Sequence, residues 1–205
     1  MARDPSIPDS PAAPERILDA AARRIAAYGA ASLALNDVAA DAGVSKALIH
    51  YHFRDKDTLL ARLADAIVTG MLARERAALA EYATQHSPLV VDALWRWLDG
   101  ELRRGGIRVL LALEAYPGVG VRAAARRAAT MRREVAAETI ERLFAILELR
   151  SRVSIALLAN VTVAFIDGLA LDFDLAVADA PGHAQPRTPR VAFDVFWLAM
   201  LSLAE

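Results

Sequence analysis

The stretch LNDVAADAGVSKALIHYHFRDKDTLL, from Leu35 to Leu60, decides the fold of this 205-residue chain. Apolar residues recur at helical spacing up to Ala42, and Gly43 follows, a residue that takes the left-handed conformation needed where a helix stops. Ser45 then has the position of an N-cap, because its hydroxyl can accept a hydrogen bond from the next turn. The spacing predicts a second short helix over about Lys46–Phe53, packed across a tight turn.

This second helix has two different faces. Ile49 and Phe53, four residues apart, are predicted to point inward. The opposite face carries a cation, an imidazole and a phenol, groups that can reach phosphates and base edges in a major groove. The residues of that face are Lys46, Ala47, His50 and Tyr51. The pattern therefore predicts a helix-turn-helix DNA-binding motif.

The run AADAGVSKALIHYHFRDKDTLL, preceded by a predicted helix that ends at Tyr28 and Gly29, closely resembles the N-terminal domain of the TetR family of transcriptional regulators. The resemblance covers about residues 15 to 60, with the AGVS, HF and K-x-x-L-L elements in register. Beyond it, the chain is similar to that family only in length and helical character. The resemblance implies a homodimer that binds double-stranded DNA at a palindromic operator, most often as a repressor, and that a small molecule releases.

The predicted DNA-binding residues are Asn36, Ser45, Lys46, Ala47, His50, Tyr51, His52 and Lys56. His50 stands where the family most often has tyrosine, and it is either a phosphate or base contact or a solvated side chain. Ala34 replaces the Ser or Thr with which many relatives cap the helix and bind a phosphate, and Asn36 is expected to replace that contact in part. His52 is equally compatible with the core and with a phosphate contact.

Composition predicts an all-α fold. Hydrophobic residues make up 56% of the chain and aromatic residues 6%, and the sequence has no sustained alternation or hairpin turn of a sheet. We expect a disordered arm over residues 1–13, a three-helix DNA-binding domain over 14–60, and a larger ligand-binding and dimerisation bundle over 61–205. A helix that begins at Asp55 and Lys56 is predicted to be shared by both domains.

Further helices are predicted at about residues 89–102, 107–116, 119–149, 152–175 and 189–203, with a mobile loop over 179–189. Residues 153–171 are apolar over nearly the length of a membrane span. The polar Asn160 and Asp167 within this segment favour a buried helix over a transmembrane one. The family resemblance implies that residues 152–175 and 189–203 form the homodimer interface.

The charge and the metal-binding residue types exclude several functions. The chain has no cysteine, and its four histidines lack the spacing of a metal site, so neither a metal nor a cofactor is expected. The net charge is −1, and acids balance bases within residues 14–60, so DNA binding requires the charges to be segregated. The N-terminus lacks an apolar signal segment, which predicts a cytoplasmic protein that does not enter a membrane.

The candidate ligand-pocket residues in the C-terminal part are Trp95, Trp97, Glu114, Tyr116, Met131, Phe144, Phe165 and Asp167. The apolar members would suit a largely hydrophobic small-molecule effector, or they are simply core. Glu114 and Asp167 each interrupt an apolar run, so each would either hold a polar group of the ligand or pair with an arginine across helices. A run of arginines over residues 122–133 predicts a solvated face, an anion-binding surface or a surface close to DNA.

Two other functions are compatible with the sequence. A constitutive DNA-binding protein would use its C-terminal bundle for dimerisation alone. An enzyme on a helical bundle would need a catalytic group of residues, and the sequence has no metal-binding pair, no nucleophile with a base at defined spacing and no phosphate loop. The predicted function is therefore a regulator and not an enzyme.

Overall fold

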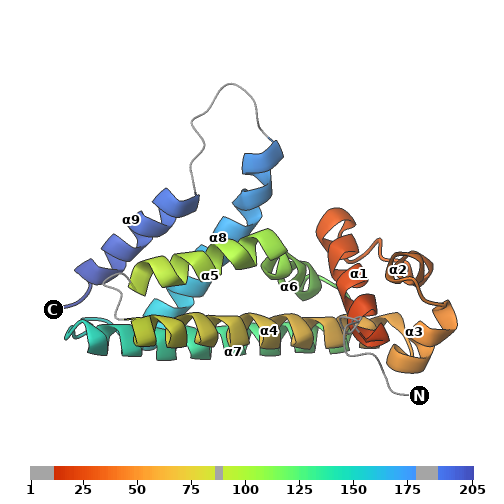
Figure 1. Ribbon diagram of the computed structural model, residues 1–205, viewed down its shortest axis with the longest axis horizontal. Helices are drawn as coiled ribbons and strands as arrows, with labels where there is room; N and C mark the ends of the chain where they lie inside the picture. The colour runs from red at the N-terminus through yellow and green to blue at the C-terminus, as the bar shows by residue number, and fades with distance from the viewer. Residues whose placement is uncertain (1–11, 86–89, 179–188) are drawn as a thin grey trace, which may run out of the picture.

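The computed structural model describes residues 12–85, 90–178 and 189–205, and these segments form nine helices and no strand (Figure 1). The helices are α1 Ala13–Tyr28, α2 Leu35–Ala42, α3 Lys46–Phe53, α4 Lys56–Gln85, α5 Val90–Arg104, α6 Gly106–Glu114, α7 Val119–Ile146, α8 Ile155–Ala178 and α9 Pro189–Ser202. The predicted all-α fold is confirmed.

The helix ends lie close to the predicted ones. The second helix of the motif spans Lys46–Phe53 as predicted, and α4 continues without a break past residue 60, where we placed the domain boundary. Ala13, which we assigned to the disordered arm, belongs to α1. Residues 1–11 of that arm, and the predicted loop up to residue 188, lie outside the described residues.

The molecule is built along two long helices, α4 and α7, which lie side by side and run in the same direction (Figure 1). Asp65 on α4 pairs with Arg127 on α7 at 3.3 Å, and ten residues further along α4 Glu75 meets Thr139. The α1–α3 domain lies at the end where both helices begin. Any movement of α4 is therefore shared between this domain and the C-terminal bundle.

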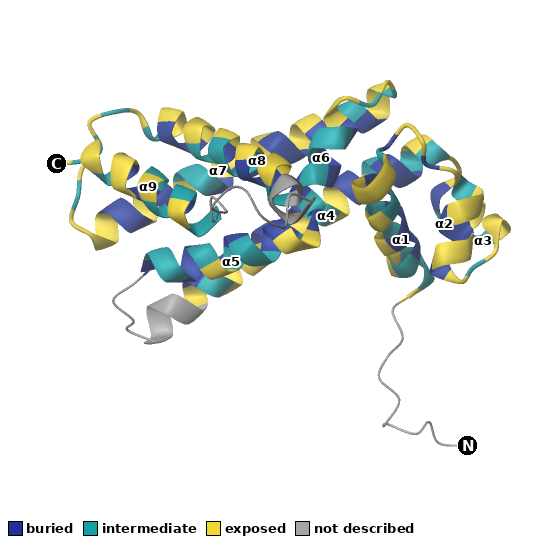
Figure 2. Ribbon diagram, turned by 90° about the horizontal axis from the view of Figure 1, so that it is seen from above, coloured by how far each residue is buried: buried dark blue, intermediate teal, exposed yellow. Residues whose placement is uncertain are grey.

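Helices α8 and α9 form the outer side of the C-terminal bundle, and much of their surface is exposed in the single chain (Figure 2). The segment Ile155–Phe173 of α8 is long and apolar enough to cross a membrane, yet only 22% of it is buried. This low burial differs from our expectation of a helix covered on most sides. The single chain leaves uncovered an apolar surface that a soluble helix normally buries.

Candidate DNA-binding site and ligand cavity

The turn between α2 and α3 has the geometry that its sequence predicts. Gly43 ends α2 in the left-handed conformation, with φ 62° and ψ 41°. Ser45 then caps α3, because its hydroxyl oxygen accepts a hydrogen bond from the Leu48 amide at 3.2 Å. Ile49 and Phe53 are buried against the rest of the domain. These contacts fix α3 at the surface with its opposite face outward.

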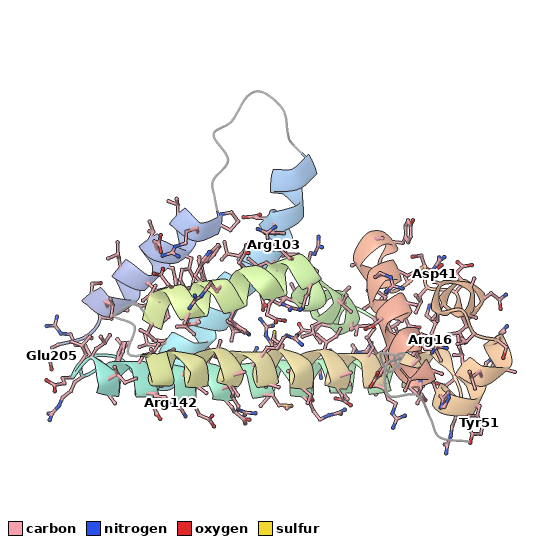
Figure 3. The ribbon with its side chains drawn as sticks, viewed as in Figure 1. Arg16, Asp41, Tyr51, Arg103, Arg142 and Glu205 are labelled. Carbon is pink, nitrogen blue, oxygen red and sulfur yellow. The ribbon has the colours of Figure 1, made fainter. Side chains whose placement is uncertain are left out.

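The outward face of α3 holds the four side chains that we assigned to it. Lys46, Ala47, His50 and Tyr51 are exposed, and Tyr51 is 81% exposed at the tip of the domain (Figure 3). His52 is half-buried, and its ring contacts those of Tyr51 and Phe53 edge-on. Their contacts with DNA remain predictions.

The start of α2 is less complete than in a capped helix. Asn36 is exposed in its first turn, and the N-cap Ala34 offers no side-chain hydrogen bond. Asn36 is therefore accessible to a partner outside the chain, and its phosphate contact stays a prediction.

The imidazole of His50 is held by the end of its own helix. Its Nδ1 lies 2.6 Å from the backbone oxygen of Arg54. A carbonyl oxygen only accepts, so Nδ1 carries the hydrogen and Nε2 is the nitrogen available to an outside partner. The sequence had no signal for this contact, because it depends on the conformation of Arg54.

Arg54 has an uncommon backbone conformation, with φ 62° and ψ −61°. The amide of Asp55 donates to the carbonyl of Phe53 at 2.7 Å, so the three residues form a γ-turn of the strained kind. Asp55 then caps α4 by accepting from the Thr58 amide at 2.7 Å, and this bond lowers the pKa of its carboxyl. The short turn sets the angle between α3 and α4.

Charges in the N-terminal domain are segregated, as DNA binding requires. The guanidinium of Arg24 on α1 pairs with Asp37 at 2.9 Å and with Asp41 at 2.7 Å, both on α2. The hydrogen bond from Arg24 lowers the pKa of Asp41. Two of the six acids of the domain are thus paired with α1, and the exposed face of α3 carries Lys46 without an acid beside it.

Lys56 lies inside the junction between the domains. Its Nζ donates to the Ala31 carbonyl at 3.2 Å and lies 5.5 Å from the centre of the Tyr116 ring. Burial lowers the pKa of its ammonium group. A phosphate contact from Lys56, which remains a prediction, would require its ammonium group to leave or share these partners.

A small cavity lies in the C-terminal bundle, with a volume of about 50 Å³. It is enclosed by α4, α5, α7, α8 and α9. Its walls are mostly apolar, and five aromatic side chains contribute to them: Trp97, Phe165, Phe193, Phe196 and Trp197. Trp97 and Phe165 were predicted to line a ligand pocket, and the structure brings them together here.

The other candidates for the pocket lie elsewhere. Trp95 packs on Phe193 outside the cavity, Phe144 belongs to the core, and Glu114 and Met131 are exposed. Tyr116 lies at the domain junction beside Asp57, where burial first and then this carboxylate raise the pKa of its phenol. Each correction has the same cause: helical periodicity places a residue on a face without telling which neighbour that face meets.

Asp167 pairs with Arg132 at 2.6 Å, so of the two alternatives for this residue the structure has the ion pair across helices. Arg132 itself lines the cavity and is buried, although we read its arginine run as a solvated face or an anion-binding surface. Arg127 of the same run pairs with Asp65 at the surface.

Sequence reasoning missed the main polar groups of the cavity. Glu75 is only 6% exposed, and its Oε1 accepts a hydrogen bond from the Thr139 hydroxyl at 3.0 Å. Burial raises the pKa of the Glu75 carboxyl. The sequence around Glu75, LARERAAL, is that of an ordinary polar helix face and gave no signal. Within the described residues no group of histidines and carboxylates could hold a metal ion.

The exposed face of α3, its capped turn and the helices behind it form a helix-turn-helix motif joined to a helical bundle. Residues 17–63 match the family model of bacterial regulatory proteins of the tetR family. The N-terminal domain is therefore similar to the DNA-binding domain of TetR-family regulators, and the match ends at residue 63. No curated protein sequence matches the chain.

Solved structures share the whole fold. A TetR transcriptional regulator from Legionella pneumophila is 16% identical, with 94% of this chain and 100% of that chain covered and a TM-score of 0.71. A transcriptional regulator from Rhodococcus sp. Rha1 is 22% identical. The match covers 94% of this chain and 98% of that chain, with a TM-score of 0.70. The transcriptional regulator FadR from Bacillus subtilis, solved in complex with stearoyl-CoA, is 17% identical. The match covers 91% of this chain and 97% of that chain, with a TM-score of 0.67.

Proposed function

We propose that this protein is a dimeric cytoplasmic repressor that binds a palindromic operator through α3 and is released by a small-molecule effector. The observation that carries the proposal is the outward face of α3, where Lys46, His50 and Tyr51 are exposed together at the tip of the molecule. Such a face, fixed by a buried opposite side, is suited to enter a major groove.

A dimer with two-fold symmetry would bind a palindromic site. Two recognition helices related by a two-fold axis bind half-sites about 34 to 36 Å apart, or a modestly larger distance. Exposed apolar positions of α8 recur at spacings of four and three residues, at Leu157, Val161, Ala164, Gly168 and Leu171. Those of α9 do the same at Val191, Val195 and Leu198. Stripes with this period pack as helix bundles, which favours a four-helix interface between two chains.

Release by an effector follows from the position of the cavity. Glu75 and its neighbours on α4 line the cavity, and the same helix begins beside the DNA-binding domain at Lys56. A ligand that prefers one position of α4 would change the separation of the two recognition helices. A coupling free energy of about 1 to 3 kcal/mol would change DNA affinity about 5-fold to 150-fold.

The test is selection of DNA fragments from a random pool, followed by titration of the selected duplex at several salt concentrations. We expect a palindrome, and we expect Lys46→Ala to reduce the slope of log affinity against log salt by about one unit per bound subunit, since it removes one phosphate contact. Arg142→Ala is the matched control, because Arg142 is exposed on α7 far from α3 (Figure 3). A chain that selects no sequence, or equal slopes for both variants, would contradict the proposal.

A constitutive DNA-binding protein is the second candidate. The small size of the cavity favours it, since ordinary ligand sites have volumes of about 300 to 1,000 Å³. The buried polar groups of the cavity favour the effector-released form, because a bundle that only dimerises has no need of them.

A further inference from the structure

Two charged side chains line the cavity, the carboxyl group of Glu75 and the guanidinium of Arg132, and Asp167 lies behind Arg132 as its partner. Arg132 has a carboxylate partner, because its Nη2 lies 2.6 Å from the Asp167 carboxylate. Glu75 receives only the hydroxyl of Thr139 and makes no ion pair within the part of the chain that the structure describes. Arg76 and Arg132 attract Glu75 without forming an ion pair with it. A buried carboxylate without a directly paired cation is costly, so Glu75 is the incomplete member of this group.

The charge of these three groups discriminates between ligands. With all of them ionised, Glu75, Asp167 and Arg132 sum to one negative charge. A ligand with a carboxylate would add a second negative charge to a buried site, whereas a ligand with one positive charge would bring the site to neutrality. A cationic group is therefore the complement that the buried charges favour.

The aromatic walls favour the same ligand chemistry. Rings of Trp97, Phe193 and Trp197 surround the cavity, and the faces of such rings attract organic cations, with the strongest effect for tryptophan. Phe165 and Phe196 stack on each other with ring centroids 4.2 Å apart and contribute a further wall. Because the cavity has a volume of only about 50 Å³, its walls must move apart before a ligand enters.

We infer that this cavity binds a small organic molecule with one positive charge and an apolar body, with its cation between Glu75 and the tryptophan rings. The inference rests on the proposed function, since it names the chemical class of the effector. It places the ligand's charge against α4, the helix that continues into the DNA-binding domain, and its apolar part against α8 and α9.

The test compares three probes of nearly equal shape on the full chain, without DNA: choline, its neutral isostere 3,3-dimethylbutan-1-ol, and the anion 3,3-dimethylbutanoate. Binding is measured by calorimetry. We expect choline to bind about tenfold more tightly than the neutral isostere, and the anion to bind weakest. Equal affinity of choline and its isostere, tighter binding of the anion, or no binding of any probe would overturn the inference.

Substitution of Glu75 locates the preference. Glu75→Gln should abolish the difference between choline and its isostere, and Glu138→Gln, an exposed carboxylate next to Thr139 on α7, should leave it intact. The comparison of probes on the unaltered chain needs no variant, so it stands even if a variant fails to fold. DNA affinity of the ligand-free chain tests the proposed function separately: intact operator binding with no cation preference would overturn this inference alone.

Discussion

At the scale of single residues, Arg54 carries local strain that the rest of the domain maintains. Its φ of 62° is uncommon for a residue with a side chain, and such conformations cost about 1 to 3 kcal/mol. The carbonyl of Arg54 holds the imidazole of His50, so the strained turn also orients a side chain on the outward face of α3. Strain at this position thus fixes the geometry of the recognition helix.

Replacing Arg54 by glycine should relieve that strain. We expect Arg54→Gly to raise the free energy of unfolding by about 1 kcal/mol, after allowance for the greater freedom of glycine in the unfolded chain. Thermal unfolding without DNA measures it. Arg133→Gly, in the middle of α7 at an exposed position, should change stability in the opposite direction by about 1 kcal/mol. Destabilisation by both variants would show that the Arg54 conformation is not strained.

The buried carboxyl of Glu75 makes a prediction about pH. Burial raises the pKa of this carboxyl in the folded state. Below the ordinary glutamate pKa of about 4.3 the carboxyl is neutral in both states and does not lower stability. As pH rises from there through the raised pKa, the folded state loses stability. Glu75→Gln stays neutral at every pH. The variant should therefore be more stable than the natural chain by on the order of 1 kcal/mol at pH 8, and equally stable at pH 4.

The control for this effect is Glu134→Gln, which changes an exposed carboxylate on α7. It should leave stability unchanged within about 0.5 kcal/mol at both pH values, as ordinary surface substitutions do. If Glu75→Gln gives the same gain at pH 4 as at pH 8, the gain does not come from ionisation of Glu75.

At the scale of helices, local signals in the sequence predicted what local physics determines. Gly43 and Ser45 fixed the end of α2 and the start of α3, because a left-handed cap and an N-cap depend on neighbouring residues alone. The outward face of α3 followed from spacing in the same way. Glu114 shows the limit: it interrupts an apolar run, but the end of α6 leaves it exposed, and only the packing of helices decides this.

The cavity was predicted least well, because it lies where five helices meet. Trp97 and Phe165 are far apart in sequence, and nothing in either segment indicates that they share a wall with Glu75. Lys56 and Tyr116 show the same limit at the domain junction, since one was assigned to DNA and the other to the ligand, yet they contact each other. Such pairings depend on the relative positions of whole helices.

The junction where α4 and α7 begin makes a prediction at this scale. A Cβ added at Gly118, just before α7, would lie 2.5 Å from Oδ2 of Asp57, whose carboxylate accepts from the Tyr116 hydroxyl. The backbone angles of Gly118 are ordinary, so the effect of a substitution there is steric. We expect Gly118→Ala to lower the free energy of unfolding by about 1 kcal/mol, as overpacking does.

Gly120 provides the matched control, because it lies two residues further along, inside α7, with open space around it. Gly120→Ala should raise stability by about 0.5 to 1 kcal/mol through its better helix propensity. Chemical denaturation of both variants gives the comparison. Equal effects of the two alanines would mean that Asp57 moves aside without cost and that the junction is loosely packed.

At the scale of the whole molecule, the exposed apolar stripes of α8 and α9 and the outward face of α3 belong to one arrangement. Helix α9 lies at one end of the long α4–α7 pair, α8 rises from that end toward the middle, and the recognition helix lies at the other end (Figures 1 and 2). Two chains joined at the stripes would hold their recognition helices at a distance set by α4 and α7. The proposed dimer therefore determines the spacing of the half-sites as well as the apolar burial.

A charge placed on the stripe tests this arrangement. Val195 on α9 is 60% exposed in the single chain. In a two-fold interface each chain would contribute one glutamate from Val195→Glu, so two like charges would be buried together. We expect the dimer dissociation constant to rise at least about 100-fold, and operator affinity to fall with it, because the monomer holds only one half-site. Val119→Glu is the control, since Val119 is 75% exposed at the start of α7, away from both stripes. Sedimentation velocity over a range of concentrations reports the assembly state, and a Val195→Glu chain that stays dimeric and binds its operator normally would place the interface on another surface.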